Sequence, residues 1–478
     1  MKQIYFFFSF LILLGWFSGA NCQINTDSLN NIIDKSPKNK KAEICNKIAE
    51  DLLLVNPQKT IEYADKASSF AERRNDNEQI ILSELIKGDA WSNMNNAPNA
   101  LIRYQKALQL SENEKNNELV ARCYNSLGEL SFNSGDYDKA LNYFQIASDK
   151  VKNSDSYKEA SKALNNMGVI SKKRGKYKDA LNYYNQALEL DRNNANLKGI
   201  STDLNNIGLV YKVLDQNERA LIYYLQALEI DQKFPASLEL AIDYNNIGMV
   251  YCENGEYGKA IDYFFKTLEL YKKLNRKDYI SLVYNNIGGV YDSWGKMDLA
   301  LDYYQQAYNI DKGFDNQINL ATDLNNLGSV YYQMKNYDEA LKNYKESGQI
   351  FRKLGIEDSE AGSIFNIGGI LLDMKQYNEA IQYFNQSLQI YKRLGNESDM
   401  ALNYIDLGIS YLKLNQNEKA LENFKMAFEI GQLINSLPLK MNVYSYLTKY
   451  YEAVGNYQKA LEAYREYSRI KDTIFTEK

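Results

Sequence analysis

The sequence predicts an all-α protein, an α-solenoid of about eleven helix-turn-helix repeats. Two observations predict this fold. Small residues recur every 40 positions without insertion or deletion, and each period contains two stretches of helically spaced apolar residues. The low content of turn-forming residues, 5 Pro and 26 Gly among 478 residues, agrees with it, because a turn-rich β fold needs more of both.

Columns of glycine, alanine and aromatic residues define the period. A glycine inside a helix costs about 1 kcal/mol relative to alanine, so a whole column of them indicates that helices approach closely. We expect these glycines to face alanines of the second helix, and the aromatic rings to fill the spaces between helices. The glycine column is Gly88, Gly128, Gly168, Gly208, Gly248, Gly288, Gly328, Gly368 and Gly408, and the matching aromatic column runs from Tyr104 to Tyr464.

Each period reads as two helices separated by a short break. In residues 197–233, one apolar face ends at Tyr211, the pattern breaks at Asp215, and a second apolar face begins at Ala220. Residues at the break position are mostly Gly, Asn or Asp, which tolerate the left-handed conformation that ends many helices. The break column is Asn95, Gly135, Gly175, Asp215, Gly255, Gly295, Lys335, Lys375, Asn415 and Gly455.

The sequence divides into four segments. Residues 1–22 have a positive start, an apolar run and small residues, the pattern of a secretory signal peptide. Residues 23–40 are an N-terminal lead-in, residues 41–473 the solenoid and residues 474–478 a C-terminal tail. A lipoprotein anchored through Cys22 is the alternative, although the preceding residues match a lipobox poorly. No later apolar run is long enough for a transmembrane helix, so we expect a protein exported across the inner membrane and periplasmic.

Composition argues against several classes of function. The formal net charge of −5 gives no basic stripe for nucleic acid. The absence of histidine removes histidine-based catalysis and most zinc sites. Cys45, Cys123 and Cys252 form no Cys-x-x-Cys pair, so we interpret them as small buried residues. We expect no enzymatic activity, no cofactor and no metal.

The repeated pattern resembles the tetratricopeptide repeat (TPR) family. One repeat carries the resemblance in Leu127-Gly128, Gly135, Ala140 and Phe144. The period is 40 residues rather than the commoner 34, and the proline that usually follows the second helix is mostly absent. The resemblance implies a right-handed superhelix whose first helices line a concave groove, and it implies binding of a protein or peptide rather than chemistry.

The end of the sequence resembles the exported repeat region of bacterial TPR sensor proteins, at the point where those proteins leave the repeats. The resemblance lies in Tyr464 to Phe475. It implies the sensor half of a signalling protein without its output domain. We also expect Tyr464, Tyr467 and Ile470 to lie on the end face that meets the next repeat elsewhere in the array. Either the tail Ile474-Phe475 folds over this face, or a membrane signalling partner or a second copy of the chain covers it.

Two neighbouring columns of asparagine are the candidate peptide-binding residues. Asparagine is a poor helix former, so its repetition in register needs a cause. A row of carboxamides can pair with the backbone of an extended peptide, or it can bond groups of neighbouring repeats. We expect the first column to favour binding and the second to be structural. The first column is Asn125, Asn165, Asn205, Asn245, Asn285 and Asn325, and the second is Asn166, Asn206, Asn246, Asn286, Asn326 and Asn366.

Charge is also graded along the first helices. Basic residues occupy the early repeats, whereas Glu253, Asp292 and Asp373 take equivalent positions later. An extended ligand could dock its acidic end on the basic part, although an ordinary solvated surface explains the same pattern. The basic residues are Arg122, Lys162, Lys172, Lys173 and Lys212.

Two functions from different classes follow from these observations. The first is an exported, non-enzymatic protein–protein interaction scaffold that binds a peptide or protein segment in the groove. The alternative is a sensory component of a signal-transduction system, acting with a separate membrane partner through the C-terminal face. The first hypothesis places the important residues in the asparagine columns, and the second places them at Tyr467 and Ile470.

Overall fold

The computed structural model describes residues 26–53, 55–152, 156–234, 237–314 and 316–476, and we restrict the description to these residues. Every regular element in this part of the chain is an α-helix. The chain divides into two compact units, Met1–Arg276 and Lys277–Lys478, which we call unit 1 and unit 2 and describe separately. The predicted signal peptide and Cys22 lie outside the described residues.

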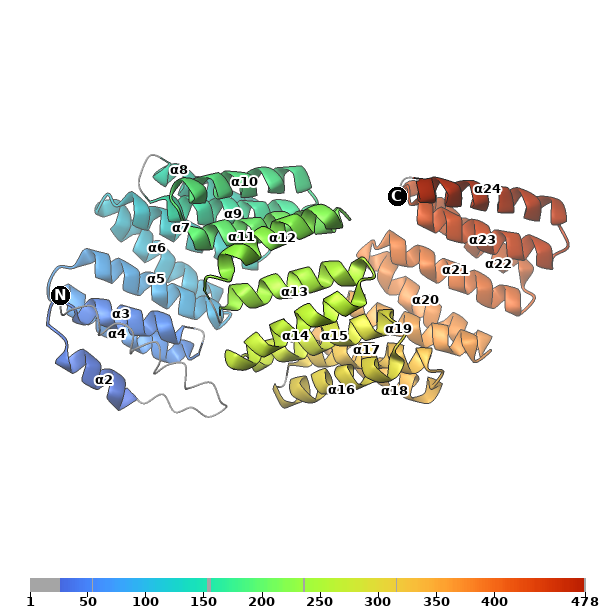
Figure 1. Ribbon diagram of the computed structural model, residues 1–478, viewed down its shortest axis with the longest axis horizontal. Helices are drawn as coiled ribbons and strands as arrows, with labels where there is room; N and C mark the ends of the chain where they lie inside the picture. The colour runs from blue at the N-terminus through green and yellow to red at the C-terminus, as the bar shows by residue number, and fades with distance from the viewer. Residues whose placement is uncertain (1–25, 54, 153–155, 235–236, 315, 477–478) are drawn as a thin grey trace. The chain divides into compact units, whose positions relative to one another are not determined.

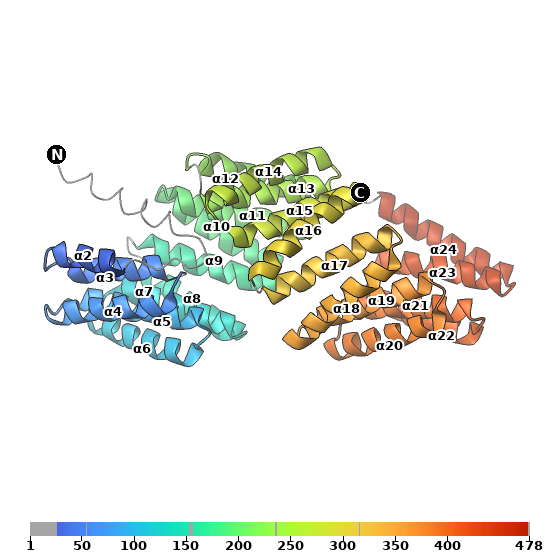
Figure 2. The ribbon, with the colours of Figure 1, turned by 90° about the horizontal axis from the view of Figure 1, so that it is seen from below.

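Unit 1 consists of a lead-in helix and six helix pairs, which follow one another in the ribbon drawings (Figure 1, Figure 2). In each pair we call the odd-numbered helix the first helix and the even-numbered helix the second helix. The elements are α2 (Thr26–Lys35), α3 (Lys41–Leu52), α4 (Pro57–Glu72), α5 (Asn77–Asn93), α6 (Ala97–Asn113), α7 (Asn117–Asn133), α8 (Tyr137–Val151), α9 (Tyr157–Lys173), α10 (Tyr177–Asn193), α11 (Leu197–Val213), α12 (Asn217–Asp231), α13 (Leu238–Glu253) and α14 (Tyr257–Lys273).

Unit 2 consists of five further helix pairs with the same 40-residue register. The two helices of a pair pack together, and each second helix packs on the first helix of the next pair within the unit. The elements are α15 (Lys277–Ser293), α16 (Met297–Phe314), α17 (Gln317–Gln333), α18 (Tyr337–Leu354), α19 (Glu357–Asp373), α20 (Tyr377–Leu394), α21 (Glu397–Lys413), α22 (Asn417–Leu433), α23 (Leu437–Ala453) and α24 (Tyr457–Thr476). The predicted α-solenoid of about eleven TPR-type repeats is confirmed.

The turn within each pair has the predicted left-handed residue. All ten residues of the break column have positive φ, including Lys335 at 61° and Lys375 at 63°. At the first of these turns, the Asn96 N–H donates to the Trp91 carbonyl at 2.9 Å, which closes the helix end as in a Schellman motif. Side chains of Asn or Asp cap several of the helices that follow, as Asp136 does by accepting from the Lys139 N–H.

The glycine column contacts the aromatic column of its own repeat. A Cβ added at Gly168 would stand 2.5 Å from the Cε1 atom of Tyr184, and the other glycines of the column meet the equivalent ring in the same way. We predicted that these glycines face alanines of the second helix, and this was wrong, because they face the aromatic rings of that helix. The absent side chain makes room for a ring, and the Tyr184 ring is fully buried there.

The two ends of the chain add detail to the predicted segments. Helix α2 occupies Thr26–Lys35, inside the predicted lead-in, and it contacts α3. Helix α24 continues through Thr476, so the helix runs across the predicted boundary between residues 473 and 474. None of the helices in the described residues is both long and apolar enough to pass through a lipid bilayer.

Candidate functional site

The first asparagine column lies between neighbouring repeats. Asn125 is fully buried and donates from Nδ2 to the Glu159 carbonyl at 3.0 Å and to its carboxylate at 2.8 Å. Asn165 donates to Asp203 at 2.7 Å, and the carboxamide of Asn205 donates to Asp243 at 2.6 Å. In unit 2, Asn285 donates in the same way to Asp323. Asn245 and Asn325 lie half-buried at the equivalent positions of α13 and α17.

These contacts fit the alternative in which the asparagine side chains bond groups of neighbouring repeats and not a peptide. Each of the four carboxamides with a described bond donates an N–H to the first helix of the next repeat. Peptide binding by the first column stays a prediction, and its carboxamides have little hydrogen-bonding capacity left for a ligand.

The second asparagine column rests on the first. Asn206 donates from Nδ2 to Oδ1 of Asn165 at 2.9 Å, and Asn246 donates to Asn205 at 3.4 Å. Asn326 donates to Asn285 at 3.1 Å in unit 2. Each of these bonds runs back to the preceding first helix. Pairs of carboxamides therefore link neighbouring first helices within each unit.

The second column is half-buried, as is the first apart from the buried Asn125. Asn206, Asn246 and Asn326 are half-buried, and each uses one of its two N–H groups in the bonds above. The carbonyl oxygen and the second N–H of each are left for solvent or a ligand. We call the surface of the first helices that carries this column the first-helix face. Its other members are Asn166, which donates to Glu129 at 3.3 Å, and the half-buried Asn286 and Asn366.

Three of the five basic candidates are neutralised by carboxylates on first helices of other repeats. Lys162 lies 2.9 Å from Glu129, and Lys212 lies 2.8 Å from Glu253. Arg122 lies 3.3 Å from Glu50, on the first helix of the first repeat. These pairs leave little excess positive charge for an acidic ligand.

The remaining two basic candidates have different surroundings. Lys173 lies over the ring of Phe132 and donates to the hydroxyl of Tyr137 at 3.3 Å. Lys172 is half-buried, and burial lowers the pKa of its ammonium group. Binding of an acidic ligand by these residues stays a prediction. Neither Lys172 nor Lys173 has a carboxylate partner among the described residues.

The acidic positions of unit 2 have neutral partners. Gln333 donates to Asp292 at 2.7 Å, and the hydroxyl of Tyr332 donates to Asp373 at 2.6 Å. Asp406 takes the place of asparagine in the second column, and burial together with the charge of Asp373 raises its pKa to about 7. The first-helix face of unit 2 is therefore more acidic than that of unit 1.

Sequence reasoning missed a buried ion cluster between the first two repeats. Glu84 and Lys87 of α5 are nearly inaccessible to solvent and lie 2.7 Å apart. Glu84 also accepts from Arg103 and Lys106 of α6. Lys87 reaches back to Asp65 of α4 at 3.0 Å. The missed signal was that Glu84 and Lys87 stand at positions of the first helix that are otherwise apolar or small.

The three predicted residues of the C-terminal face differ in exposure. Tyr464 is 54% exposed, whereas the equivalent Phe424 is fully buried. Tyr467 is half-buried, and its ring lies 6.0 Å from that of Tyr464. Ile470 is buried, which agrees with a covered end face at this residue and not with an open one.

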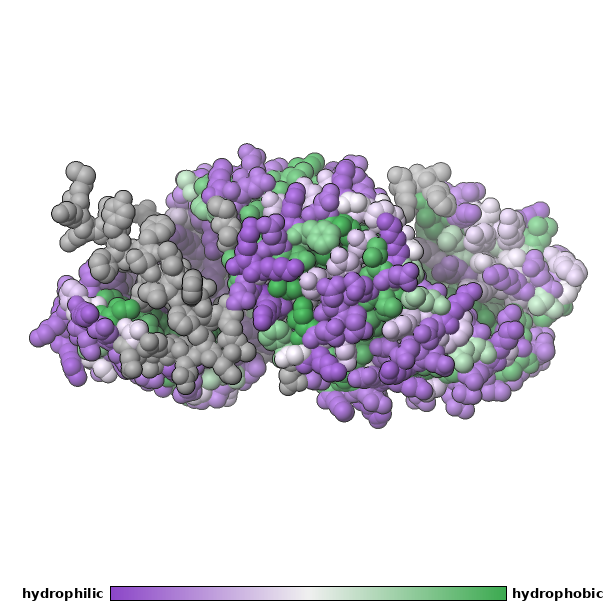
Figure 3. Space-filling model, turned by 60° about the horizontal axis from the view of Figure 1, so that its bottom comes forward, coloured by the Kyte–Doolittle hydropathy of each residue, from purple (hydrophilic) through white to green (hydrophobic). Residues whose placement is uncertain are grey.

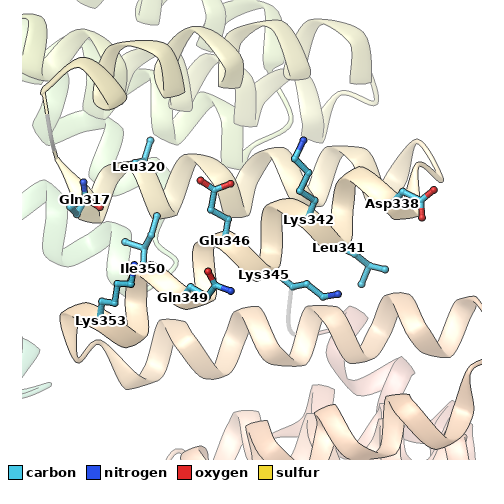
Figure 4. Close-up of a pocket in the computed structure, with 10 residues that line it drawn as sticks. All are labelled: Gln317, Leu320, Asp338, Leu341, Lys342, Lys345, Glu346, Gln349, Ile350 and Lys353. Atoms are coloured by element: carbon cyan, nitrogen blue, oxygen red, sulfur yellow. The ribbon is translucent and has the colours of Figure 1, made fainter.

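A further depression lies away from the asparagine columns. An open groove of about 790 Å³ in unit 2 is lined mostly by α18, where Lys342, Lys345 and Glu346 project into the surrounding space (Figure 4). It contains no residue of the asparagine columns. Its lining of mixed charges carries no defined recognition chemistry. The hydropathy surface in Figure 3 is likewise mainly hydrophilic, with apolar patches between the charged side chains. Within the described residues no group of three or more side chains is placed to hold a metal ion.

Helix pairs in a constant register, glycine–aromatic contacts and amide networks between first helices define a helical repeat protein. The family comparison names the class: a tetratricopeptide repeat model matches residues 159–233, 238–313, 319–393 and 359–433, which together exceed half of the chain. A second tetratricopeptide repeat model matches residues 121–147. The chain belongs to the tetratricopeptide repeat family, whose repeats generally serve as non-enzymatic protein-interaction scaffolds.

Solved structures share the fold at low sequence identity. A STAND signal-transduction ATPase with a tetratricopeptide repeat sensor from Pyrococcus horikoshii is 14% identical, with a TM-score of 0.54; the match covers 88% of this chain and 68% of that one. The apo form of RapI is 17% identical, with a TM-score of 0.48 over 58% of this chain and 99% of that one. BtubC from P. vanneervenii is 21% identical, with a TM-score of 0.41 over 46% of this chain and 91% of that one. Among curated proteins none matches the chain. These likenesses show the fold alone.

Proposed function

We propose that the chain is an exported, non-enzymatic scaffold that binds an extended segment of a partner protein along the first-helix face. The observation that carries the proposal is the alignment of second-column carboxamides on neighbouring first helices. Asn206 and Asn246 in unit 1, and Asn326 in unit 2, are held by bonds to the first column and keep a free carbonyl oxygen and N–H. A peptide backbone offers the complementary groups at every residue.

The division of roles in this proposal reverses the one expected from the sequence. The first column positions the second, and the second contacts the ligand. Preorganised amides lower the entropic cost of ordering a ligand, because their own rotamers are fixed before binding. Binding through backbone groups makes the interaction tolerant of peptide sequence, so side-chain preference comes from residues around the amides.

Binding by unit 1 is tested with a library of peptides displayed on phage and selected on the purified protein. The test variant carries Asn166→Ala, Asn206→Ala and Asn246→Ala together. The control carries Asn185→Ala, because Asn185 is an exposed asparagine of α10 that bonds only its own helix, at the Leu181 carbonyl. We expect selected peptides to bind wild type and the control and to lose at least tenfold in affinity for the triple variant, about 1.4 kcal/mol. Equal binding to all three, with unchanged circular dichroism, contradicts the proposal.

Export is part of the proposal and rests on the pattern of residues 1–22. Cell fractionation followed by N-terminal sequencing tests it. A mature protein that begins at Gln23 in the periplasmic fraction supports cleavage of a signal peptide. A lipid-modified Cys22 supports the lipoprotein alternative, and an intact N-terminus in the cytoplasm contradicts export.

The second candidate function is a sensory component that acts with a separate membrane partner. Tyr464 is exposed beside Tyr467, and this exposure favours the sensory candidate. Aromatic side chains are more frequent in protein interfaces than on the rest of a protein surface. Crosslinking in cells from a photoreactive residue at position 464, compared with one at the exposed Asn185, tests it. A membrane protein crosslinked from the first position alone supports the sensory role, and its absence from both contradicts it.

A further inference from the structure

Three junctions between neighbouring repeats contain the same four polar residues. Each junction combines a serine and an asparagine of one first helix with an aspartate of its second helix and an aspartate of the next first helix. All the aspartates are buried, at most 3% exposed. The three sets are Ser161, Asn165, Asp191 and Asp203; Ser201, Asn205, Asp231 and Asp243; and Ser281, Asn285, Asp311 and Asp323.

The geometry is the same in each set. In the first, Ser161 donates to Asp191 at 2.6 Å and Asn165 donates to Asp203 at 2.7 Å. The Asp191 carboxyl faces that of Asp203 across the junction of α10 and α11, and its proximity raises the pKa of Asp203. In the second set the serine bond measures 2.5 Å, and in the third it measures 2.9 Å.

In each pair an oxygen of the aspartate on the next first helix lacks a donor, and in the third pair Oδ2 of Asp311 lacks one as well. The Oδ2 atoms of Asp203, Asp243 and Asp323 are buried and accept no hydrogen bond from any N–H or O–H group. Each belongs to the carboxyl that faces the other aspartate of its set. Two buried carboxyl groups that face each other disfavour the state in which both are ionised, and one proton shared between them satisfies an orphaned oxygen.

Burial and the neighbouring carboxyl act in the same direction on the titration of these groups. They raise the pKa of Asp203, Asp243 and Asp323 to about 8 each, although the asparagine donors oppose the shift. The proton is therefore retained at neutral pH. Raised carboxyl pKa values also mean that folding takes up protons, so the stability from these pairs is present at acid pH and lost as the pH rises toward 8.

Other charged groups near the pairs are few. Tyr184 lies beside Asp203, and Asn196 donates to Asp191 at 2.7 Å. Glu239 lies close to the second pair, where Lys198 binds it at 2.7 Å and neutralises it. Asn319 opposes the rise in the pKa of Asp311 in the third set, and the charge of Lys198 opposes that of Asp231 in the second. No cation forms an ion pair with the buried carboxyls of the three sets in the described residues, so none replaces the proton.

We propose that these three junctions are proton-dependent locks, in which each aspartate pair holds two repeats together while it carries one proton and loosens when the proton is lost. The chain then stiffens below pH 8 and relaxes above it at α10/α11, α12/α13 and α16/α17. The serine donor accompanies the aspartate pair in all three sets. Where the pair is absent, apolar or small residues occupy the positions, as Ala121, Val151 and Ala163 do at α8/α9.

The test variant replaces one aspartate of each pair: Asp203→Asn, Asp243→Asn and Asp323→Asn together. The new carboxamide accepts from the asparagine donor and donates to the remaining aspartate, so the hydrogen bonds survive without a titrating proton. We expect unfolding of wild type at pH 7 to release about three more protons per chain than unfolding of the variant, measured with an indicator dye. We also expect the thermal midpoint of wild type, relative to the variant, to fall between pH 6 and pH 9.

Infrared spectroscopy of folded wild type gives a second readout that does not depend on the variant. Protonated carboxyl groups are expected at pH 7 and are expected to disappear above pH 9. Hydrogen exchange at α10/α11 is expected to accelerate relative to the apolar α8/α9 junction over the same range. Equal proton release from wild type and the variant overturns the proposal. The absence of a protonated carboxyl group from folded wild type at pH 7 also overturns it, and this second readout holds even where the triple variant fails to fold.

Discussion

The ring of Phe384 lies directly against the backbone of Gly368, and a Cβ added at that glycine would stand 2.6 Å from the ring's Cε1 atom. The next residue, Gly369, is in the same helix and meets nothing within 4 Å. Two adjacent glycines of α19 therefore have opposite surroundings for an added side chain. The first makes room for a ring, and the second faces open space.

This difference predicts opposite effects of the same substitution. Gly368→Ala is expected to destabilise the protein by about 1–3 kcal/mol, because the ring must leave its site. Gly369→Ala is expected to stabilise it by about 0.5–1 kcal/mol, because alanine is the better helix former. Urea unfolding followed by circular dichroism measures both. Effects of the same sign and size would contradict the assigned contact.

The buried Glu84–Lys87 pair predicts that removing the glutamate charge, with its shape kept, lowers the stability of the protein strongly. Glu84→Gln is expected to cost about 3–5 kcal/mol, because it leaves the buried Lys87 ammonium without its nearest carboxylate. The exposed pair Lys342–Glu339 is the control, and Lys342→Met is expected to leave the free energy of unfolding nearly unchanged. Urea unfolding at pH 7 compares the two variants.

The same pair also predicts a dependence on acid. Burial raises the pKa of Glu84, but Lys87 and Lys106 outweigh it and hold the pKa below its ordinary value. A lowered carboxyl pKa contributes stability that is present above the unfolded value and lost as the pH falls through the folded one. The difference in thermal midpoint between wild type and Glu84→Gln is therefore expected to shrink between pH 5 and pH 3. A constant difference would show that the glutamate charge is not the stabilising group.

The two asparagine columns are expected to differ in their effect on stability. Asn165 bonds the Ser161 carbonyl and Asp203 and accepts from Asn206, so Asn165→Ala leaves a buried carboxyl without its donor. We expect it to cost about 1–3 kcal/mol. Asn166→Ala removes only a bond to the half-exposed Glu129 and is expected to cost less than about 1 kcal/mol. Chemical unfolding of the two variants settles the order.

The described cysteines are expected to react at different rates. Burial raises the pKa of Cys45 to about 11 and that of Cys123 to about 12, and both thiols are inaccessible. Cys252 is only half-buried, although burial also raises its pKa. A maleimide at pH 8 is expected to modify Cys252 first among these three in the folded protein. Peptide mass spectrometry measures the order, and faster labelling of Cys45 or Cys123 would contradict their burial.

Much of the fold follows from the sequence because the period is so regular. The break column predicted the left-handed turns, and it did so even at Lys335 and Lys375, where the residue type alone gives no such signal. The register supplied that information. The 40-residue step also predicted the helix pairs. An uninterrupted period gives no sign of the division after Arg276, because that division depends on contacts between helices and not on composition.

The site was less predictable because its roles depend on packing between repeats. Residues Asn205 and Asn206 are identical in type and adjacent in sequence, and only the position of Asp243 on the next helix makes the first one structural. The acid pairs were missed for the same reason. Asp191 and Asp203 belong to different helices, and nothing local shows that they face each other. A search for polar residues that occur together 30 and 42 positions after a serine would have found them.

The shared acid pairs restrict how this array can change by duplication or loss of repeats. The repeat built from α11 and α12 contributes Asp203 to the junction before it and Asp231 to the junction after it. Deleting the repeat before it would set Asp203 against Val151, an apolar side chain that offers no proton. Recombination among these repeats therefore preserves the fold only when both neighbours match, and the order of the repeats becomes an inherited property of the protein.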